Sequence, residues 1–439
     1  MKKLGKRLWQ MLTHPVSKFL EDGILGGVLL ILGTLVALFL ANSSYHDSYE
    51  SMLHLELGFR IGGFGYEASL EHFINDGLMV IFFFVVGLEI KRELLVGELC
   101  SMKKALLPAI AAFGGMIVPA GLYFLLNFNG DYASGWGIPM ATDIAFALGI
   151  LAILGNRVPF SLKVFLLALA IFDDIGAILV IAVFYGGPIN WTSLLIGLGL
   201  LLCSVALNVF GVRRTLPYAL LGIALWFTLL NSGVHATIAG VLLAMTIPAR
   251  SKLDQQGFKN QTGDFIRNFP DTPVEIMVVD EDQRELMKKI QCSVNDLDSP
   301  LQRLEDSLHD VSNYLILPIF ALANAGVQII GGSSEQTLFN PISIGILAGL
   351  VLGKPIGIFL AVLLSSATGV ASMPDGVTKL QILGVGCLGG IGFTMSIFIT
   401  NLAITDTVPQ NEAKLAILLA SVLSSVIGIL VLNKAADRR

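Results

Sequence analysis

The sequence predicts an all-α integral membrane protein with about twelve transmembrane helices. Three observations lead to this fold class. Of the 439 residues, 54% are hydrophobic and only 14% are charged, whereas a soluble domain carries about 25% charged residues. Apolar runs of about 18 residues or more, long enough for a helix to cross the hydrocarbon, recur from one end of the chain to the other. The alternating pattern of a membrane β-barrel does not appear.

Hydropathy places the helices in order along the chain. The first apolar run follows a short basic segment, as in a signal peptide. Because that run is too long and many spans follow it, an uncleaved helix is expected. The predicted spans are 23–42, 75–94, 105–127, 139–155, 160–185, 192–210, 216–231, 232–248, 311–330, 342–367, 378–402 and 412–432.

Lysines and arginines gather in every second connection, on the side of the N-terminus. They are Lys91, Arg92, Lys103, Lys104, Arg157, Lys163, Arg213, Arg214, Arg250, Lys252, Lys379, Lys434, Arg438 and Arg439. The alternate connections contain almost none, with Arg60 as the main exception. The positive-inside rule therefore predicts that both termini lie in the cytoplasm. The expected partner is the lipid bilayer, and nothing in the sequence indicates nucleic acid.

Two connections between spans are longer than the rest. The external one, 43–74, contains LHLELGFRIGGFGYEASL, in which alternate residues are apolar before Gly62 and Gly63. This pattern predicts a β-hairpin, although an irregular loop fits the stretch as well. A hairpin would offer an exposed edge as the contact of a homodimer. The internal connection, 249–310, is polar, acidic and helix-prone near its end, and it is predicted to be a partly disordered cytoplasmic insertion, not a second domain.

Two spans contain residues that interrupt a helix. The segment GIPMATDIAFALG includes Pro139, and GVGCLGGIGFTMS includes five glycines. Each segment lies in the middle of a group of three spans, 105–185 or 342–432. Paired broken segments in corresponding positions indicate inverted-topology repeats with a site near the middle of the membrane. Ordinary close packing of helices through small residues would leave a similar pattern.

Four charged side chains fall near the middle of predicted spans, namely Asp143, Asp173, Asp174 and Lys354. A charge at the centre of the bilayer costs about 2.5–3.5 kcal/mol on insertion scales, so a compensating use is expected. Asp173 and Asp174 are neighbours, about 100° apart around a helix, so one can face water while the other meets a cation. Lys354 is the candidate cation. The alternative is a buried Asp–Lys pair that only holds helices together.

These residue types suit the exchange of a cation for a proton. A carboxylate in a partly desolvated, water-accessible pocket gains and loses a proton near neutral pH. Its oxygens are also hard ligands for sodium or lithium, so proton and cation compete. Asp143 would offset the partial positive charge of opposed helix N-termini, and Lys354 the negative charge of opposed C-termini. The Thr142 hydroxyl could be a ligand or cap, or could bond back to its own helix.

A mixed charge cluster lies at the cytoplasmic end of the second span. It consists of Glu89, Lys91, Arg92 and Glu93, and Glu305 and His309 are expected to join it. One interpretation is a solvated, positive-inside helix end, and the other is a pH-sensitive electrostatic gate at the mouth of a funnel. His235, in NSGVHATIAGV, is interpreted as a satisfied polar residue at a helix junction, with a sensing role as the alternative.

Six segments together resemble the NhaA family of bacterial sodium/proton antiporters. They are MATDIAFALGIL, ALAIFDDIGAI, NSGVHATIAGV, LILPIFALANAGV, LGKPIGI and GIGFTMSIFI. They follow the order of the family over nearly the whole chain, and the combination is highly specific. The resemblance implies a twelve-helix fold whose interrupted fourth and eleventh helices cross, and a homodimer in the bacterial inner membrane. It also implies exchange of internal sodium or lithium for external protons, without a cofactor.

The resemblance also implies a role for individual residues. Asp174 would be the main cation ligand and proton carrier, and Asp173, paired with Lys354, its partner in transient binding of Na⁺ or Li⁺. Thr142 and Asp143 would lie at the crossing of the helices. The pH-sensing region would contain Glu89, Arg92, Glu93, Glu305 and His309. The chain departs from the family pattern in a longer internal loop at 249–300 and in Asp306, where some relatives carry a histidine. Both departures bear on the pH range of activity.

Other functions use similar residues. An intramembrane aspartyl protease needs two aspartates from separate helices, but Asp173 and Asp174 are adjacent and no G-x-G-D stretch is present. Asp143 with either of them would still fit. A passive channel or a sodium-coupled symporter would also need a polar site in the membrane. The sequence favours a secondary transporter, not an enzyme. We expect it to be pH-regulated, and electrogenic where two protonatable groups are emptied for each monovalent cation.

Overall fold

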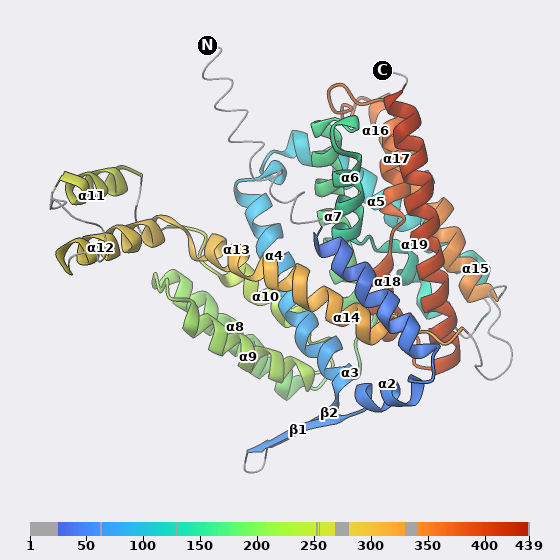
Figure 1. Ribbon diagram of the computed structural model, residues 1–439, viewed down its shortest axis with the longest axis horizontal. Helices are drawn as coiled ribbons and strands as arrows, with labels where there is room; N and C mark the ends of the chain where they lie inside the picture. The colour runs from blue at the N-terminus through green and yellow to red at the C-terminus, as the bar shows by residue number, and fades with distance from the viewer. Residues whose placement is uncertain are drawn as a thin grey trace.

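The computed structural model describes residues 25–61, 64–128, 130, 132–251, 253, 255–267, 281–329 and 340–437. Over these residues the protein is a bundle of helices with one small β-hairpin (Figure 1). In the same part of the chain, seven helices are long and apolar enough to cross a membrane, and two bent helix pairs raise the number to nine. The predicted class, an all-α membrane protein, is confirmed.

The helices of the first half follow the predicted spans closely. A helix over Leu25–Ala41 is followed by α2 (His46–Leu53) after a turn of 117°. The next span is continuous and consists of α3 (Leu70–Phe73), the π-helical turn η1 (Ile74–Leu78) and α4 (Met79–Leu95). The elements that follow are η2 (Glu98–Cys100), α5 (Met102–Asn127), the 3-10 helix η3 (Ala133–Met140), α6 (Ile144–Leu154), η4 (Gly155–Arg157), α7 (Phe160–Phe184) and α8 (Trp191–Val209).

The second half departs from prediction in two spans. After α9 (Thr215–Leu230), the span predicted at 232–248 contains α10 (Ile238–Thr246), which has only nine residues. The span predicted at 311–330 consists of η5 (Ser312–Ile316) and α14 (Leu317–Asn324) and ends at Asn324. The helix α13 (Pro300–Val311) lies in the connection before this span and leads into it. The remaining elements are α15 (Pro341–Ala348), the π-helical turn η6 (Gly349–Gly353), α16 (Lys354–Ala367), α17 (Lys379–Gly389), α18 (Phe393–Ala403) and α19 (Thr407–Ala436).

Local capping residues set where several helices begin. Ser299 accepts from the backbone N–H of Gln302, whose side chain reaches back, and this capping box starts α13. Thr378 and Gln381 form the same motif at the start of α17. A capping box leaves fewer unpaired backbone donors at a helix end, so these sequences fix the first turn before any tertiary contact is made.

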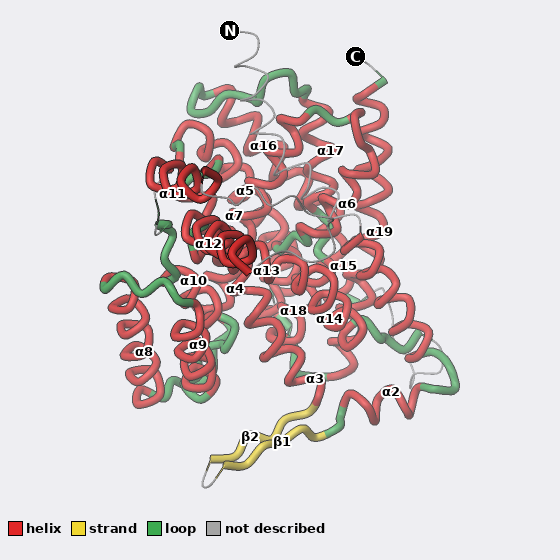
Figure 2. The backbone as a smooth tube through the Cα atoms, turned by 60° about the vertical axis from the view of Figure 1, so that its left-hand side comes forward, coloured by secondary structure: helices red, strands yellow, loops and turns green. Residues whose placement is uncertain are grey.

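The external connection forms the predicted β-hairpin. Strands β1 (Glu56–Ile61) and β2 (Phe64–Ser69) pair antiparallel, with Glu56 opposite Ser69 and Ile61 opposite Phe64. Gly62 and Gly63, predicted to form the turn, lie outside the described residues. In both views the hairpin projects from one end of the bundle, and the C-terminal end of α19 lies at the opposite end (Figures 1 and 2). The homodimer contact through this hairpin stays a prediction.

The internal connection is more helical than predicted. It contains α11 (Gln255–Arg267) and α12 (Glu281–Leu297) before α13, while residues 268–280 lie outside the described part. The Ser293 hydroxyl of α12 donates to Gln261 Oε1 of α11 at 3.4 Å. The two helices extend away from the bundle as a pair (Figure 1).

Both interrupted spans are broken where the sequence indicates. Residues 141–143 separate η3 from α6, beginning two residues after Pro139. Residues 390–392 separate α17 from α18, which are bent by 45° relative to each other. The breaks leave backbone groups free of helical hydrogen bonds inside the bundle, where other elements can use them.

Candidate functional site

Helix α7 carries two adjacent aspartates into the centre of the bundle. Its 25 residues are almost entirely apolar, which suits a helix surrounded by other helices and lipid. Asp173 is 1% exposed and Asp174 is 2% exposed. Because consecutive helical residues point about 100° apart, the two carboxylates meet different surroundings.

Asp173 is held by a cation and a hydroxyl. Lys354 Nζ lies 2.8 Å from Asp173 Oδ2, and neither side chain is exposed. The Thr142 Oγ1 lies 2.6 Å from the same carboxylate oxygen and 2.8 Å from the carbonyl oxygen of Gly389. Thr142 therefore serves neighbouring elements and does not bond back to its own helix. The other oxygen, Asp173 Oδ1, is buried and has no hydrogen bond to any described residue.

The two helix breaks cross at Asp143. Its backbone N–H donates to the carbonyl oxygen of Ile391 at 2.7 Å. Its Oδ1 accepts from the backbone N–H of Phe146 at 3.0 Å, as the N-cap of α6. Its Oδ2 accepts from the backbone N–H of Thr394 at 3.1 Å and from the Thr394 hydroxyl at 2.5 Å, in the first turn of α18. One carboxylate thus caps two helix N-termini and offsets their partial positive charge.

Lys354 has the complementary position. Its ammonium donates to the carbonyl oxygen of Met140, the last residue of η3, where the partial charge of the helix end is negative. It does so while paired with Asp173. The predicted aspartate at opposed helix N-termini is therefore present, whereas the lysine that was expected at opposed C-termini donates to one helix end, that of η3.

Asp174 lines a cavity, and Asp173 is not among the residues that line it. About 50 Å³ of this cavity is open to the centres of water molecules, which is room for several waters. Its polar lining comes from Glu89, Thr142, Asp143, Asp174, His309, Ser312, Asn313 and Thr394. One of the two neighbouring aspartates lines a cavity large enough for water and the other is paired with a cation, which is the division expected from the sequence.

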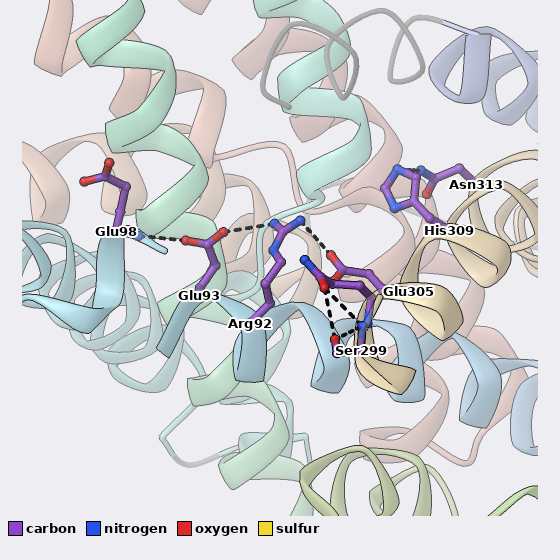
Figure 3. Close-up of polar contacts among 8 residues, drawn as sticks. Arg92, Glu93, Glu98, Ser299, Glu305, His309 and Asn313 are labelled. Atoms are coloured by element: carbon purple, nitrogen blue, oxygen red, sulfur yellow. Dashed lines mark hydrogen bonds and ion pairs between the residues drawn. The ribbon is translucent and has the colours of Figure 1, made fainter. Parts of the chain in front are cut away.

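An ion-pair network is centred on Arg92, three residues after the cavity-lining Glu89 on α4 (Figure 3). Arg92 Nη2 is 2.9 Å from Glu93 Oε1, and Arg92 Nη1 is 2.8 Å from Glu305 Oε1. Glu93 Oε2 also accepts from the backbone N–H of Glu98 at 3.0 Å. Burial raises the pKa of Glu305, outside the spanning helices, to about 7 in spite of the attraction of Arg92, and the charge of Glu89 contributes in the same direction as burial. The network joins α4 to α13.

Glu89 and His309 are lining residues of the cavity. Both line it together with Asp174. Glu89 Oε1 is buried without a hydrogen bond in the part of the chain described. The amide of Asn313 donates to His309 Nε2 at 2.9 Å, and Figure 3 shows this pair apart from Arg92 and Glu305. Lys91, at the same helix end, instead donates to backbone carbonyls at the end of α10.

His235 is not part of the Arg92 ion-pair network. Its Nε2 lies 3.7 Å from Asp76 Oδ1, and its Nδ1 lies 2.8 Å from Thr237 Oγ1, so it is a hydrogen-bonded residue at a helix junction, as interpreted. Asp76 belongs to η1, near the beginning of the span in which Arg92 is near the end. At a rise of 1.5 Å per residue the two positions are about 24 Å apart. The structure therefore separates His235 from the other residues assigned to pH sensing.

Two further residues of the site escape sequence reasoning. Thr394 donates twice to Asp143, and Asp76 meets His235. A hydroxyl residue directly after a glycine-rich break is typical of a helix cap, and this signal could have identified Thr394. Lys354 also donates to the backbone carbonyl of Met140, and a backbone contact of this kind cannot be predicted from the types of side chain in the sequence.

Comparisons with known proteins agree over almost the whole chain. The family model described as Na⁺/H⁺ antiporter 1 matches residues 17–432. The chain is 44% identical to the Na⁺/H⁺ antiporter NhaA of Sulfurimonas denitrificans, over 97% of this chain and 96% of the relative. It is 47% identical to that of Oleidesulfovibrio alaskensis over 96% and 94%, and 44% identical to that of Helicobacter pylori over 99% and 98%. The chain belongs to the Na⁺/H⁺ antiporter 1 family of membrane transporters.

Proposed function

We propose that the protein exports cytoplasmic Na⁺ or Li⁺ in exchange for external protons by alternating access. The observation that carries this proposal is that two neighbouring aspartates have different surroundings. Asp174 lines a cavity with room for water, while Asp173 is paired with Lys354. Membership of the family supports sodium/proton exchange as the reaction.

Competition at Asp174 is the step that couples the two fluxes. A carboxylate that holds a proton offers a weaker site for a cation, and a cation bound to its oxygens displaces the proton. Asp173 and the Thr142 hydroxyl lie next to this position and complete the oxygen ligands. Asp143 accepts three hydrogen bonds at two helix N-termini, so we assign it to holding the crossing in shape.

The same site accounts for electrogenic exchange. Asp174 and the Asp173–Lys354 pair are the two protonatable groups that we assign to each transport cycle. If both groups release their protons to the cytoplasm for each monovalent cation that is exported, one net positive charge moves inward per cycle. A membrane potential, negative inside, contributes about 2.3 kcal/mol per charge for each 100 mV and therefore drives export.

The rest of the molecule would serve this exchange. We propose that the groups 105–185 and 342–432 are inverted repeats that expose the crossing to either side in turn. The ion pairs of Arg92 with Glu93 and Glu305 would set the pH at which the transporter works. In this proposal the protein is a homodimer in the bacterial inner membrane with both termini in the cytoplasm, and it serves pH and sodium homeostasis.

The test is exchange by the purified protein in proteoliposomes. Addition of Na⁺ or Li⁺ on one side should move protons to that side, and a potential clamped by potassium and valinomycin should change the rate. If one proton competes with each Na⁺, the KM for Na⁺ should rise about tenfold for each unit by which the pH falls in the acidic range. The maximal rate should stay constant. Sodium flux without proton movement would indicate a channel, and fluxes in the same direction a symporter.

A further inference from the structure

A second group of titratable side chains lies at the other end of the span that contains Arg92. His72 Nε2 is 3.0 Å from Asp76 Oδ2, and His235 Nε2 is 3.7 Å from Asp76 Oδ1. Each oxygen of one carboxylate therefore faces one imidazole. The side chains are 54% exposed at His72, 14% at Asp76 and 11% at His235, so the group leads from water into the protein.

The group is held in a defined geometry. The Trp226 indole N–H donates to the backbone carbonyl of Asp76 at 3.0 Å. The backbone N–H of Thr237 donates to His235 Nδ1 at 3.4 Å. Because a backbone N–H can only donate, Nδ1 is the acceptor, and the neutral His235 ring carries its proton on Nε2, facing Asp76. Asp76 itself sits in the π-helical turn η1, a kind of irregularity that is frequent at functional sites.

An aromatic cluster centred on Phe398 packs against this group, and in our assignment it is the barrier between the group and the exchange site. The His235 ring packs edge-on against Phe398 of α18, with ring centroids 5.5 Å apart. Phe398 in turn packs against Phe83 of α4 at 5.5 Å and Phe320 of α14 at 6.3 Å. The cavity at Asp174 is lined by none of these rings. The Phe398 barrier stands on α18, one half of the broken helix, so any movement of α18 would carry it.

Among the described residues, the charges that act on His235 come from the other two members of the group, Asp76 and His72. The elements around it, α9 and α18, present Trp226 and Phe398, which do not titrate near neutral pH. A proton on His235 places an imidazolium next to the Asp76 carboxylate, and the attraction between the two opposes the cost of burying that charge.

We propose that His72, Asp76 and His235 form an external proton-loading site. It takes protons from outside water and holds them next to the Phe398 barrier until α18 opens a path to Asp174. This inference rests on the proposed exchange and on the predicted orientation, which puts the hairpin end of the molecule outside (Figure 1). It adds a proton site to the transport path that is distinct from both Asp174 and the Arg92 network.

The physical need for such a site follows from the scarcity of protons. At a diffusional limit of about 10⁹–10¹⁰ M⁻¹s⁻¹, a single group in water at about pH 8 captures only about 10–100 protons per second. Several groups that share a proton at the surface raise the rate at which protons are captured from water. The gain is therefore large at alkaline external pH and disappears at acidic external pH, where protons are abundant.

The experiment measures Na⁺ efflux from right-side-out vesicles with the internal pH, internal Na⁺ and membrane potential held fixed. The external pH is varied from about 5.5 to 8.5, around the ordinary pKa of imidazole. Asp76→Asn and the double variant His72→Gln with His235→Gln should lower the rate about fivefold to tenfold at alkaline external pH and less than about twofold at acidic pH. The KM for internal Na⁺ and the dependence on internal pH should not change.

A matched control is available at the same end of the molecule. His54 forms an exposed pair with Glu50 on α2 at 3.3 Å, and His54→Gln should leave the external pH profile unaltered. If Asp76→Asn fails to insert, His72→Gln alone, at an exposed position, should still lower the alkaline rate about twofold. Loss of rate at every external pH, an effect that follows internal pH, or an unchanged profile would each overturn the proposal. A wild-type protein without exchange would instead refute the proposed function.

Discussion

At the scale of single residues, the transport site depends on the different contacts of two neighbouring carboxylates. Asp173 has a buried ammonium at 2.8 Å and a hydroxyl at 2.6 Å. Asp174, one position further along α7, faces the cavity. A paired carboxylate is held in its charged form, whereas one in a hydrated pocket can exchange a proton for a cation. The two residues are therefore not interchangeable in spite of their identical chemistry.

Asp174→Asn should abolish exchange and leave the protein folded and inserted. An amide cannot release a proton and is a weaker ligand for Na⁺, but it keeps the size of the side chain. The measurement is Na⁺-dependent proton flux in everted vesicles, with Asp375→Asn, at an exposed loop position, as the control that should behave as wild type. Flux near the wild-type rate in Asp174→Asn would contradict the assignment of Asp174.

Lys354→Ala should destabilise the protein as well as stop transport. It leaves Asp173 buried without its partner, and loss of one member of a buried ion pair costs about 3–5 kcal/mol. The melting temperature in detergent should fall accordingly. The double variant Lys354→Ala with Asp173→Asn should recover part of this loss, because no unpaired charge is left. Equal stability of the single and double variants would mean that the cost comes from lost packing.

At the scale of elements, the crossing requires close backbone contact at the second helix break. A Cβ on Gly390 would lie 2.3 Å from the carbonyl oxygen of Leu350 and 2.8 Å from Ser424 Oγ. Gly390→Ala should therefore displace α17 from η6 and reduce the yield of folded protein, measured by size-exclusion profile and melting temperature. Gly199→Ala on α8, where nothing lies within 4 Å of the added carbon, is the control. Equal behaviour of the two variants would refute this packing.

The joint between α4 and α13 should make stability depend on pH. The pKa of Glu305 is raised from 4.5 to about 7, chiefly by burial. Its contribution to stability is therefore fully present below the ordinary pKa and is lost as the pH rises through about 7. Glu305→Gln mimics the neutral form, so its melting temperature should fall less than that of the wild type between about pH 5 and 8. Glu285→Gln, at the exposed Lys289 pair of α12, is the control. Parallel curves for wild type and Glu305→Gln would contradict the shift.

The positions of the elements could largely be predicted from sequence, and the exceptions have physical causes. Hydropathy finds an apolar run because composition decides where the chain enters lipid. It does not show where hydrogen bonding begins, so it extends α10 back over the turns at 231–237. Glycine and proline do mark interruptions, because they alter the backbone itself. The second break, 390–392, contains two glycines, and the first, 141–143, begins two residues after Pro139.

At the scale of the whole molecule, the sequence shows which residues are unusual but not which of them meet. Buried charges identify Asp173, Asp174 and Lys354 because a charge in the membrane needs a use. His235 is equally conspicuous in the sequence, yet it meets Asp76 and not His309, since only the path of the chain through the bundle decides which end of a span it reaches. Contacts to the backbone, such as that of Lys354 with Met140, cannot be predicted from the sequence either, because they too depend on the path of the chain.

The β-hairpin offers a surface for joining two copies of the molecule. In the described residues its sheet has two strands, so each strand keeps one edge free of partner strands. An exposed edge is a ready site for another strand, and the hairpin of a second copy would extend the sheet. The hairpin projects from the bundle, so such a contact can form without disturbing the transport site (Figure 2).

Removal of the hairpin should therefore convert dimers to monomers without unfolding the protomer. The backbone N–H of Leu70 donates to the carbonyl oxygen of Leu55 at 2.9 Å, so a short Gly-Ser linker can replace residues 56–69 without straining the chain. We expect light scattering in mild detergent to give half the wild-type mass, with a similar melting temperature. The control replaces α11 and α12 with the same kind of linker and should keep the dimer, since those helices extend from the bundle elsewhere. An unchanged mass after loss of the hairpin would place the contact between protomers on the helices of the bundle.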